Sequence, residues 1–529
     1  MKAPLAFISR RVILSCFLLM LVSFLDVAGR VPRNEHGSSG AGVSASAPET
    51  GQIELNTSDP NLAAAFAWAR RQALAYAFTG DPVGDWYEAA LPGREAFCMR
   101  DVSHQSMGAQ VLGLAPNSLN MLKAFAANIS DSKDWCSYWE INRYGRPAPV
   151  DYQDDAHFWY DLPANFDVLD ACYRMYLWTG DLKYVDDPAF VNFYDRTVSD
   201  YVERWALDLD HVMKRKRLMN IRGEFDPQNK FQVSRGIPGY DEGRKDFVVG
   251  VDLLAAEYAA FRGYSQIEAL RGDFAAAEVY ANKAGAVQKF VNTTWWDEKA
   301  GDFYAVLDEN HHFQGHDGVD VLYYGAAEDG PKSKAALNDL LAAIKANPSG
   351  PVELESHYPE VLYRYGEPDV AYSEIMDLAR NGRYRQEYPE VSFSVVGAIV
   401  TGLMGIHVEA PAPHHGLQQW DYVETFVNTF PSLTKDTTWA EIRNLPVRAN
   451  RVGVKQEGNQ KTTFTNQSGP ALIWHAALPG SHETLLVDGQ STKASVEKDL
   501  SGRMTSSVQL TVGAGDTVVV EVPASSTKH

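Results

Sequence analysis

The stretch SRGIPGYDEGRKDFVVGVD, residues 234–252, is a glycine-rich loop that carries two adjacent acids, Asp241 and Glu242. The loop leads directly into a segment, 247–261, that is apolar on nearly every side. A helix that is hydrophobic all round is buried on all sides. We therefore expect an inner helix here with the acidic loop at its rim, which is where a barrel of helices would hold a catalytic carboxylate.

Residues 60 to about 406 continue this helical character. Apolar residues recur at spacings of three and four in about eleven or twelve segments, separated by short turns rich in Gly, Pro and Asp. A dozen helices in one compact domain predict two concentric rings. The expected fold class is therefore mainly α, an (α/α)6 toroid (a six-hairpin fold), and we assign this catalytic domain to residues 59–410.

The sequence changes character after His407. Alternating apolar and polar residues predict strands, and Asp488-Gly489 and the glycine-rich segment 513–515 mark turns between them. The C-terminal part, residues 411–529, is therefore expected to be an all-β sandwich domain. The predicted strands are 451–456, 461–466, 472–477, 484–487, 506–512 and 517–522.

The N-terminus has the pattern of a secretory signal. Basic residues precede an apolar run, 12–25, and the small residues Val27-Ala28-Gly29 follow it as a cleavage site. The run is shorter than the roughly 20 residues of a membrane span, although an uncleaved anchor is the alternative. We expect a signal peptide over 1–29, a disordered linker over 30–58 rich in Gly, Ser, Ala and Pro, and a secreted or periplasmic mature protein without stable membrane insertion.

Composition narrows the function classes further. A net charge of −20 disfavours nucleic-acid binding. The 12 Trp and 25 Tyr residues fit either a large core or sugar-stacking sites that would bind a carbohydrate partner. Cys98, Cys136 and Cys172 could form one disulfide and leave one thiol. No strong metal-ligand spacing and no P-loop or dinucleotide fingerprint occurs, so we predict neither a metal nor another cofactor.

Two aromatic or basic segments supply candidates for substrate binding. The first is FCMRDVSHQSMG, residues 97–108. In it, Asp101 would bind sugar hydroxyls, Arg100 would orient Asp101, and His104 lies nearby in the sequence. The alternative is that Asp101 is only a helix cap, as Asp at this position often is. The segment 135–161 is dense in aromatic rings. It adds three further candidates, for which loop packing is the alternative: Trp159, Asp154 and Asp155.

Two later segments supply carboxylates that could face Asp241. In RYRQEYPEVSFSVVG, residues 383–397, Glu387 and Glu390 precede a small apolar helix. Either is a candidate partner for Asp241, and surface charge is the alternative. The segment 353–360 adds two more substrate-binding candidates, Glu355 and His357.

Taken together, residues 60–406 resemble the six-hairpin glycosidases, in particular glycoside hydrolase family 63 and the trehalases, with the α-L-rhamnosidases as cousins. Met99-Arg100-Asp101 looks like their early Arg-Asp motif, and GYDEGRKDFVVGVDLLAAEY resembles their S-G-W-D-D-S segment followed by V-D-L-N. The resemblance implies that Asp241 is the general acid. Glu387-Tyr388 and the last helix look like the region that supplies the general base, although the expected Trp of that helix is absent.

The resemblance implies a hydrolase that cleaves a terminal sugar from an oligo- or polysaccharide. In an inverting enzyme one carboxylic acid protonates the leaving oxygen and another carboxylate activates water. We expect Asp241 as the acid and Glu387 or Glu390 as the base. Glu242 joins the substrate-binding candidates.

Three other functions remain open at the level of sequence. A uronic-acid-specific glycosidase would bind the sugar carboxylate with arginines, a polysaccharide lyase would use a Tyr/His pair, and a non-catalytic carbohydrate-binding protein would need only the aromatic rings. The arginines available for the first are Arg235, Arg244, Arg383 and Arg385. The residues available for the second are His104, His157, His357 and Tyr358.

Overall fold

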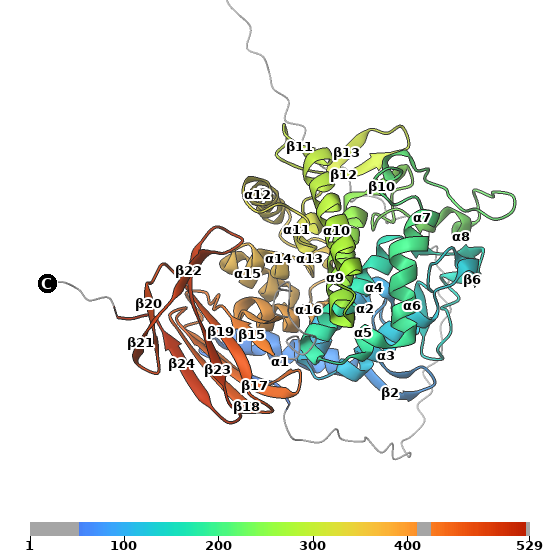
Figure 1. Ribbon diagram of the computed structural model, residues 1–529. Helices are drawn as coiled ribbons and strands as arrows, with labels where there is room; N and C mark the ends of the chain where they lie inside the picture. Colours follow the sequence, from blue (N-terminus) through green and yellow to red (C-terminus); the bar gives the residue numbers. More distant parts are fainter. Residues whose placement is uncertain (1–51, 410–424, 525–529) are drawn as a thin grey trace, which may run out of the picture.

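The computed structural model describes residues 52–409 and 425–524 (Figure 1). The predicted signal peptide, most of the predicted linker and the predicted domain boundary at 410/411 lie outside these ranges. Figure 1 shows helices in the part of the chain coloured from blue to orange, and strands in the orange-to-red part that follows. The prediction of a mainly helical part followed by an all-β part is confirmed at this level.

A series of contacts links helices that are far apart in the sequence. α2 packs against α4 and α16, and α4 packs against α9. α11 joins α9 to α14, which contacts α16, so the series returns to its starting point. We call these the inner helices: α2 (Met99–Val111), α4 (Pro163–Thr179), α9 (Val251–Arg271), α11 (Val319–Tyr323), α14 (Tyr358–Arg364) and α16 (Pro389–Ala398).

Most inner helices have a second helix packed against them. α1 packs on α16, α3 on α2, α10 on α9, α12 on α11 and α15 on α14, while α6 lies beside α3. The bounds of these helices are α1 (Pro60–Ala75), α3 (Ala115–Ala127), α6 (Pro188–Arg196), α10 (Phe274–Thr294), α12 (Pro331–Ala346) and α15 (Pro368–Leu378). Short helices in the connections are α5 (Lys183–Asp186), α7 (Val202–Arg204), α8 (Lys230–Val233) and α13 (Val352–Glu355).

The inner helix that we predicted from residue 247 begins four residues later. Residues 247–250 instead form strand β10 (Phe247–Gly250), because aromatic and β-branched side chains favour a strand and β12 (Asp302–Asp308) is there to pair with it. β11 (Trp296–Asp297) and β13 (Phe313–His316) also pair with β12. α9 ends at Arg271, and the capping residue Gly272 is left-handed with φ +85°. Most α9 residues are buried, which confirms an inner helix.

Short β-pairings hold the long connections near the starts of the inner helices. β4 (Ala96–Cys98), directly before α2, pairs with β5 (Glu140–Asn142). β8 (Tyr160–Asp161), just before α4, pairs in parallel with β9 (Arg235–Ile237), which leads into the acidic loop. The acidic loop is therefore held beside the start of α4. Two further hairpins are β2 (Ala77–Asp81) with β3 (Gly84–Tyr87) and β6 (Tyr152–Asp154) with β7 (His157–Phe158).

The C-terminal part contains two sheets that pack face to face. Alternate residues along most strands are buried, and the ring of Phe464 in one sheet stacks on Trp474 in the other at 5.0 Å between centroids. One sheet has the order β1-β16-β17-β18-β24-β20-β21 and the other β14-β15-β19-β23-β22. The strands after β1 are β14 (Ile406–Glu409), β15 (Phe426–Thr429), β16 (Trp439–Val447), β17 (Asn450–Glu457), β18 (Lys461–Ser468), β19 (Leu472–Pro479), β20 (Thr484–Val487), β21 (Gln490–Lys493), β22 (Ser495–Lys498), β23 (Met504–Val512) and β24 (Thr517–Glu521).

The β part also recruits residues from outside its predicted range. Residues 54–57, which composition assigned to a disordered linker, form β1 (Glu54–Thr57) and pair with β16. Strand β14, which we counted with the helical domain, belongs to the second sheet. Both are edge strands only four residues long. So short a segment cannot be identified as a strand from its own sequence, and pairing with a neighbouring strand decides its structure.

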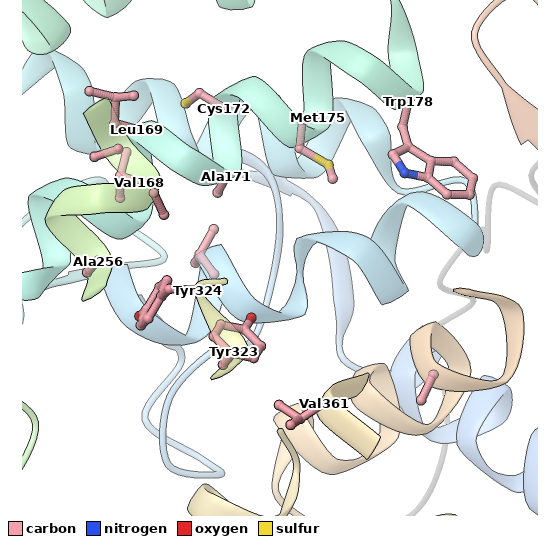
Figure 2. Packing of buried hydrophobic residues seen from close by; sticks show 14 of the residues in the cluster. Val168, Leu169, Ala171, Cys172, Met175, Trp178, Ala256, Tyr323, Tyr324 and Val361 are labelled. Atoms are coloured by element: carbon pink, nitrogen blue, oxygen red, sulfur yellow. The ribbon is translucent and has the colours of Figure 1, made fainter. Parts of the chain in front are cut away.

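Buried apolar side chains continue from the helices into the sheets as one core. Figure 2 shows the part where Val168, Leu169 and Met175 of α4 lie near Tyr323 and Tyr324. The disulfide that we considered is not formed, because the three cysteines in the described residues are free and buried. Within 52–409 and 425–524, no helix has the length and apolar character needed to cross a membrane.

Candidate active site

The N-terminal ends of the inner helices carry acidic side chains. Asp101, Asp252, Asp320 and Glu390 lie in the first turns of α2, α9, α11 and α16, where the helix dipole favours negative charge. Further carboxylates come from α4 and from the connections. We call the following set the acidic site: Arg100 with Asp101, Asp161, Asp167, Asp241, Glu242, Asp252, Asp317, Asp320 and Glu390.

Arg100 joins two of the segments that the sequence singled out. Its Nε lies 3.3 Å from Oδ1 of Asp101, and its Nη1 lies 3.3 Å from Oε1 of Glu242 in the acidic loop. The guanidinium also sits over the ring of Tyr240, 5.2 Å from the centroid. The acidic loop therefore meets the start of α2 through Arg100.

Glu390 is influenced by the charge of the same arginine. Burial, and after it the charge of Asp101, raises the pKa of Glu390 to about 8, while the positive charge of Arg100 acts in the opposite direction. Its Oε1 is buried and has no hydrogen-bond partner in the part of the chain that the structure describes. A carboxyl group with a raised pKa and a buried oxygen that lacks a partner is typical of an acid or base in catalysis.

A hydrogen-bonded network fixes the acidic loop behind these groups. Asp167 of α4 accepts hydrogen bonds from the hydroxyls of Tyr240 and Tyr324, and Asp252 of α9 accepts one from the backbone N–H of Tyr240. Burial raises the pKa of Asp167 to about 6 and that of Asp252 to about 7. Tyr240 therefore ties the loop to two inner helices.

Asp241 and Asp161 extend the acidic site on either side of Glu242. Burial raises the pKa of Asp241 against the opposing charge of Arg244, and the charge of Asp241 contributes to the raised pKa of Asp317. Asp161 is fully buried, and neither of its carboxylate oxygens has a hydrogen-bond partner within the described ranges. Burial, and then the charge of Glu242, raises the pKa of Asp161 well above its usual value.

Two histidines lie beside these acids. The rings of His104 and His357 stand perpendicular with 4.5 Å between centroids, and both contact the ring of Tyr323. Nε2 of His104 is 3.5 Å from Oδ2 of Asp167. Burial lowers the pKa of both imidazoles well below its usual value, so both are neutral near pH 7.

Seven of the residues predicted from sequence therefore come together here: Arg100, Asp101, His104, Asp241, Glu242, His357 and Glu390. Glu387, the other candidate base, does not. The Glu387 side chain is exposed. The backbone carbonyl of Glu387 accepts a hydrogen bond from the hydroxyl of Tyr76. The turn before Pro389 separates the two glutamates, so that Glu390 enters α16 and Glu387 stays outside.

The remaining predicted residues have partners elsewhere. Glu355 is buried in an ion pair with Arg383 and accepts the backbone N–H of Gly350. Trp159 packs against the small apolar cluster that contains Ile237 and Phe247. Loop packing, the alternative that we weighed for Trp159, therefore accounts for its position.

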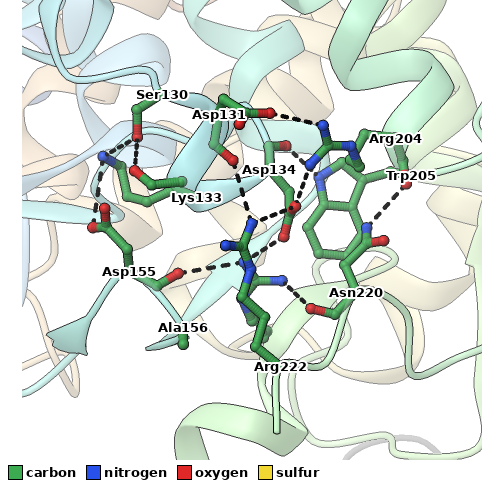
Figure 3. A network of polar contacts seen from close by, with 12 residues as sticks. Ser130, Asp131, Lys133, Asp134, Asp155, Ala156, Arg204, Trp205, Asn220 and Arg222 are labelled. Atoms are coloured by element: carbon green, nitrogen blue, oxygen red, sulfur yellow. Dashed lines mark hydrogen bonds and ion pairs between the residues drawn. The ribbon is translucent and has the colours of Figure 1, made fainter.

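Asp154 and Asp155 belong to the β6–β7 hairpin and its surroundings. Asp154 accepts hydrogen bonds from the turn and from the ring of His157. Asp155 accepts the hydroxyl of Tyr152 and lies 4.0 Å from Nζ of Lys133 (Figure 3). The structure does not bring either acid to the acidic site.

Sequence reasoning did not assign several members of the acidic site to it: Asp161, Asp167, Asp252, Asp317 and Asp320. A usable signal existed for most of them, because each of Asp167, Asp252 and Asp320 stands within the first turns of an apolar helix, as Asp101 does. Asp161 and Asp317 lie just before α4 and α11. Among the described residues, no group of three or more His, Cys, Asp or Glu side chains is arranged to hold a metal ion.

Comparison with known proteins agrees with this architecture. No protein-family model matches the sequence, and no curated protein is significantly similar to it. Solved structures are similar in fold. The α-L-rhamnosidase from Dictyoglumus thermophilum aligns with a TM-score of 0.56 at 14% identity, over 89% of this chain and 50% of its own.

A second glycosidase aligns comparably. The GH78 family rhamnosidase of Bacillus sp. GL1 gives a TM-score of 0.52 at 13% identity, over 78% of this chain and 41% of its own. The protein therefore shares its fold with these two rhamnosidases, in line with the sequence resemblance. The chain spans about half or less of the length of these two enzymes.

Proposed function

We propose that the protein is a glycoside hydrolase that removes a terminal sugar with inversion, and that its inner helices form the ring of an (α/α)6 toroid. Asp241 is the general acid and Glu390 the general base. The contacts that return from α16 to α2 support the ring. The signal-like N-terminus supports secretion.

The convergence on Arg100 carries the proposal. Asp241 and Glu390 lie 149 residues apart in the sequence (390 − 241), yet Glu242, next to Asp241, lies 3.3 Å from Arg100. Asp101 and Arg100 are the charges with the largest effect on the pKa of Glu390. Hydrolysis with inversion needs two carboxyl groups on opposite sides of the scissile bond. The raised pKa of each group suits proton transfer.

The charge of the acidic site favours a neutral sugar over a uronate. Its carboxyl groups outnumber its arginine, and those that are ionised would repel the carboxylate of a uronate. The arginines considered for a uronate are engaged elsewhere: Arg235 with Asp134, Arg244 with Asp246, Arg383 with Glu355 and Arg385 with Glu353. The same repulsion weighs against a polysaccharide lyase, which also acts on uronates.

The test is a panel of chromogenic neutral glycosides and uronides with three variants. Asp241→Asn and Glu390→Gln should each lower kcat by roughly 10²–10⁴-fold, the range that an acid or base supplies. Glu387→Gln is the matched control, because it makes the same change three residues from Glu390 on an exposed side chain, and it should keep full activity. Full activity in Glu390→Gln, or cleavage of uronides alone, would contradict the proposal.

The pH dependence tests whether Glu390 takes part in the reaction. A base must be ionised and an acid protonated, so the ionisation of Glu390 should appear as a limb of the kcat/KM profile near its pKa of about 8. Glu390→Gln should remove this limb. A wild-type profile without a limb near pH 8 would contradict a role for Glu390 in proton transfer. NMR identification of the product anomer that is formed first tests whether the configuration is inverted.

A further inference from the structure

Two buried arginines lie behind the acidic loop without a paired carboxylate. Arg215 and Arg217 are 3% and 6% exposed, whereas Lys216 between them is exposed. Arg215 is extended (φ −66°, ψ 160°), and alternate residues of an extended chain point to the same side. The chain therefore turns two guanidinium groups inward and the lysine outward, the reverse of what a solvated basic segment does.

Part of each guanidinium is bonded to backbone. Arg215 donates to the carbonyls of Trp205 and Val248, and Arg217 donates to the carbonyl of Val233 at 2.9 Å. Three donors are left over: Nη2 of Arg215 and Nε and Nη1 of Arg217 are buried without a hydrogen-bond partner in the described residues. Such donors normally have a partner, often a bound water or ion.

Neighbouring arginines in the same region are satisfied differently. Arg204, Arg222 and Arg235 all contact the carboxylate of Asp134, as Figure 3 shows for the first two. Arg215 and Arg217 have no ion pair of this kind within 52–409 and 425–524. Burial, and after it the charge of Arg217, lowers the pKa of Arg215 to about 9, so Arg215 is still cationic at neutral pH.

We propose that Arg215 and Arg217 bind a small monovalent anion of the halide class with their three free donors. A buried cation is stabilised only when an opposite charge accompanies it. A halide accepts hydrogen bonds from several directions and is small enough for a site between two side chains. The inference does not depend on the proposed hydrolysis.

The position of this site gives the anion a role in the acidic loop. Val233 and Val248, whose carbonyls the two arginines bind, stand just before and just after residues 234–247. The arginine pair therefore clamps both ends of the loop that carries Asp241 and Glu242. The anion, by offsetting the repulsion between the two guanidinium groups, holds this clamp closed.

Asp161 is the rival partner for Arg217. Its charge, followed by that of Glu309, acts to raise the pKa of Arg217, although burial lowers it overall. Both oxygens of Asp161 lack hydrogen-bond partners in the described chain, so no direct bond joins it to Arg217. If Asp161 is the partner of Arg217, bromide should not bind between the two arginines in the wild type. If a halide is the partner, bromide should bind there.

The test uses sodium bromide and the full chain. Crystals soaked in bromide should show an anomalous peak within hydrogen-bonding distance of Arg215 Nη2 and of Arg217. In solution, thermal unfolding is followed while chloride replaces gluconate at constant ionic strength. Above its dissociation constant, each tenfold rise in chloride should raise the folded-to-unfolded ratio about tenfold, because the anion binds the folded state.

The variants make the result specific. Arg217→Met should lose the chloride response, whereas Arg222→Met, which changes an exposed arginine of the Asp134 group, should keep it. Should Arg217→Met fail to fold, the bromide map of the wild type still decides. The proposal is overturned if no bromide peak lies between the arginines, if the peak forms only in Asp161→Asn, or if wild type and Arg217→Met respond equally to chloride.

Discussion

Two clusters of charge on the helical part of the protein are built in opposite ways. Around Asp134, three arginines converge on one buried carboxylate (Figure 3), and we call this set, Asp134 with Arg204, Arg222 and Arg235, the Asp134 network. In the acidic site, two carboxylates, Asp101 and Glu242, contact Arg100. Oxygens of two other acids there, Asp161 and Glu390, have no partner in the described residues.

The difference distinguishes charged side chains that stabilise the structure from charged side chains that are available for proton transfer. Opposite charges in close contact stabilise one another and resist change. Like charges held together raise each other's pKa, which costs stability and leaves protons free to move. The two clusters should therefore respond in opposite directions when a charge is removed.

The largest effect is expected from Asp134→Asn. This change leaves the fully buried Arg235 without its carboxylate partner, and removing one member of a buried ion pair costs about 3–5 kcal/mol. Urea unfolding should show this loss, while kcat of the folded fraction stays unchanged. Asp131→Asn is the control, because that exposed carboxylate pairs with Arg204 at the surface and should matter by less than about 1 kcal/mol. Equal losses in both variants would contradict the comparison.

Glu390→Gln should do the reverse and stabilise the protein at alkaline pH. The folded pKa of Glu390, about 8, lies above its ordinary value of 4.5, so the folded state holds a proton that the unfolded state has released. Stability of the wild type therefore falls as pH rises from about 4.5 to about 8. Glutamine cannot ionise and avoids this fall.

The size of that effect is modest because Glu390 is not wholly shielded from water. We expect the variant to gain up to about 1 kcal/mol of relative stability per pH unit in this window, and nothing below it. Melting temperatures at pH 4.5 and pH 9 measure the gain. Glu387→Gln should show no such pH dependence. A parallel pH dependence in wild type and Glu390→Gln would mean that Glu390 ionises as freely as an exposed acid.

The sequence predicted the helical part, the β part and the centre of the acidic site for identifiable physical reasons. Period and alternation are local properties, so α9 and strands such as β18 could be read from a short window. Asp101, Glu242 and Glu390 were found because each stands next to an apolar helix. Strand β1 was missed because its stability comes from β16, almost 400 residues away in sequence.

The candidate charged residues that lie outside the acidic site have a different explanation. Asp155 and Glu355 have the same residue types as Asp241 and Glu390. Whether a carboxylate is neutralised depends on the cation that the fold brings to it, such as Lys133 for Asp155 or Arg383 for Glu355. That pairing joins residues that are distant in the sequence, so it cannot be predicted from a single sequence.

The smallest effect is expected from Asp154→Ala, and it tests this distinction directly. Asp154 Oδ1 accepts the backbone N–H groups of Ala156 and His157 at 2.8 and 2.9 Å and the ring of His157 at 2.9 Å. Losing a turn acceptor at an exposed hairpin costs about 1 kcal/mol or less. Asp154→Asn keeps the acceptor oxygen and should lose less than the alanine variant. Because these bonds are local, kcat/KM should stay within about twofold of wild type on any glycoside that the protein cleaves. A tenfold loss in both variants would show that the β6–β7 hairpin contacts the substrate, and the boundary between structural and functional charge would then have to include it.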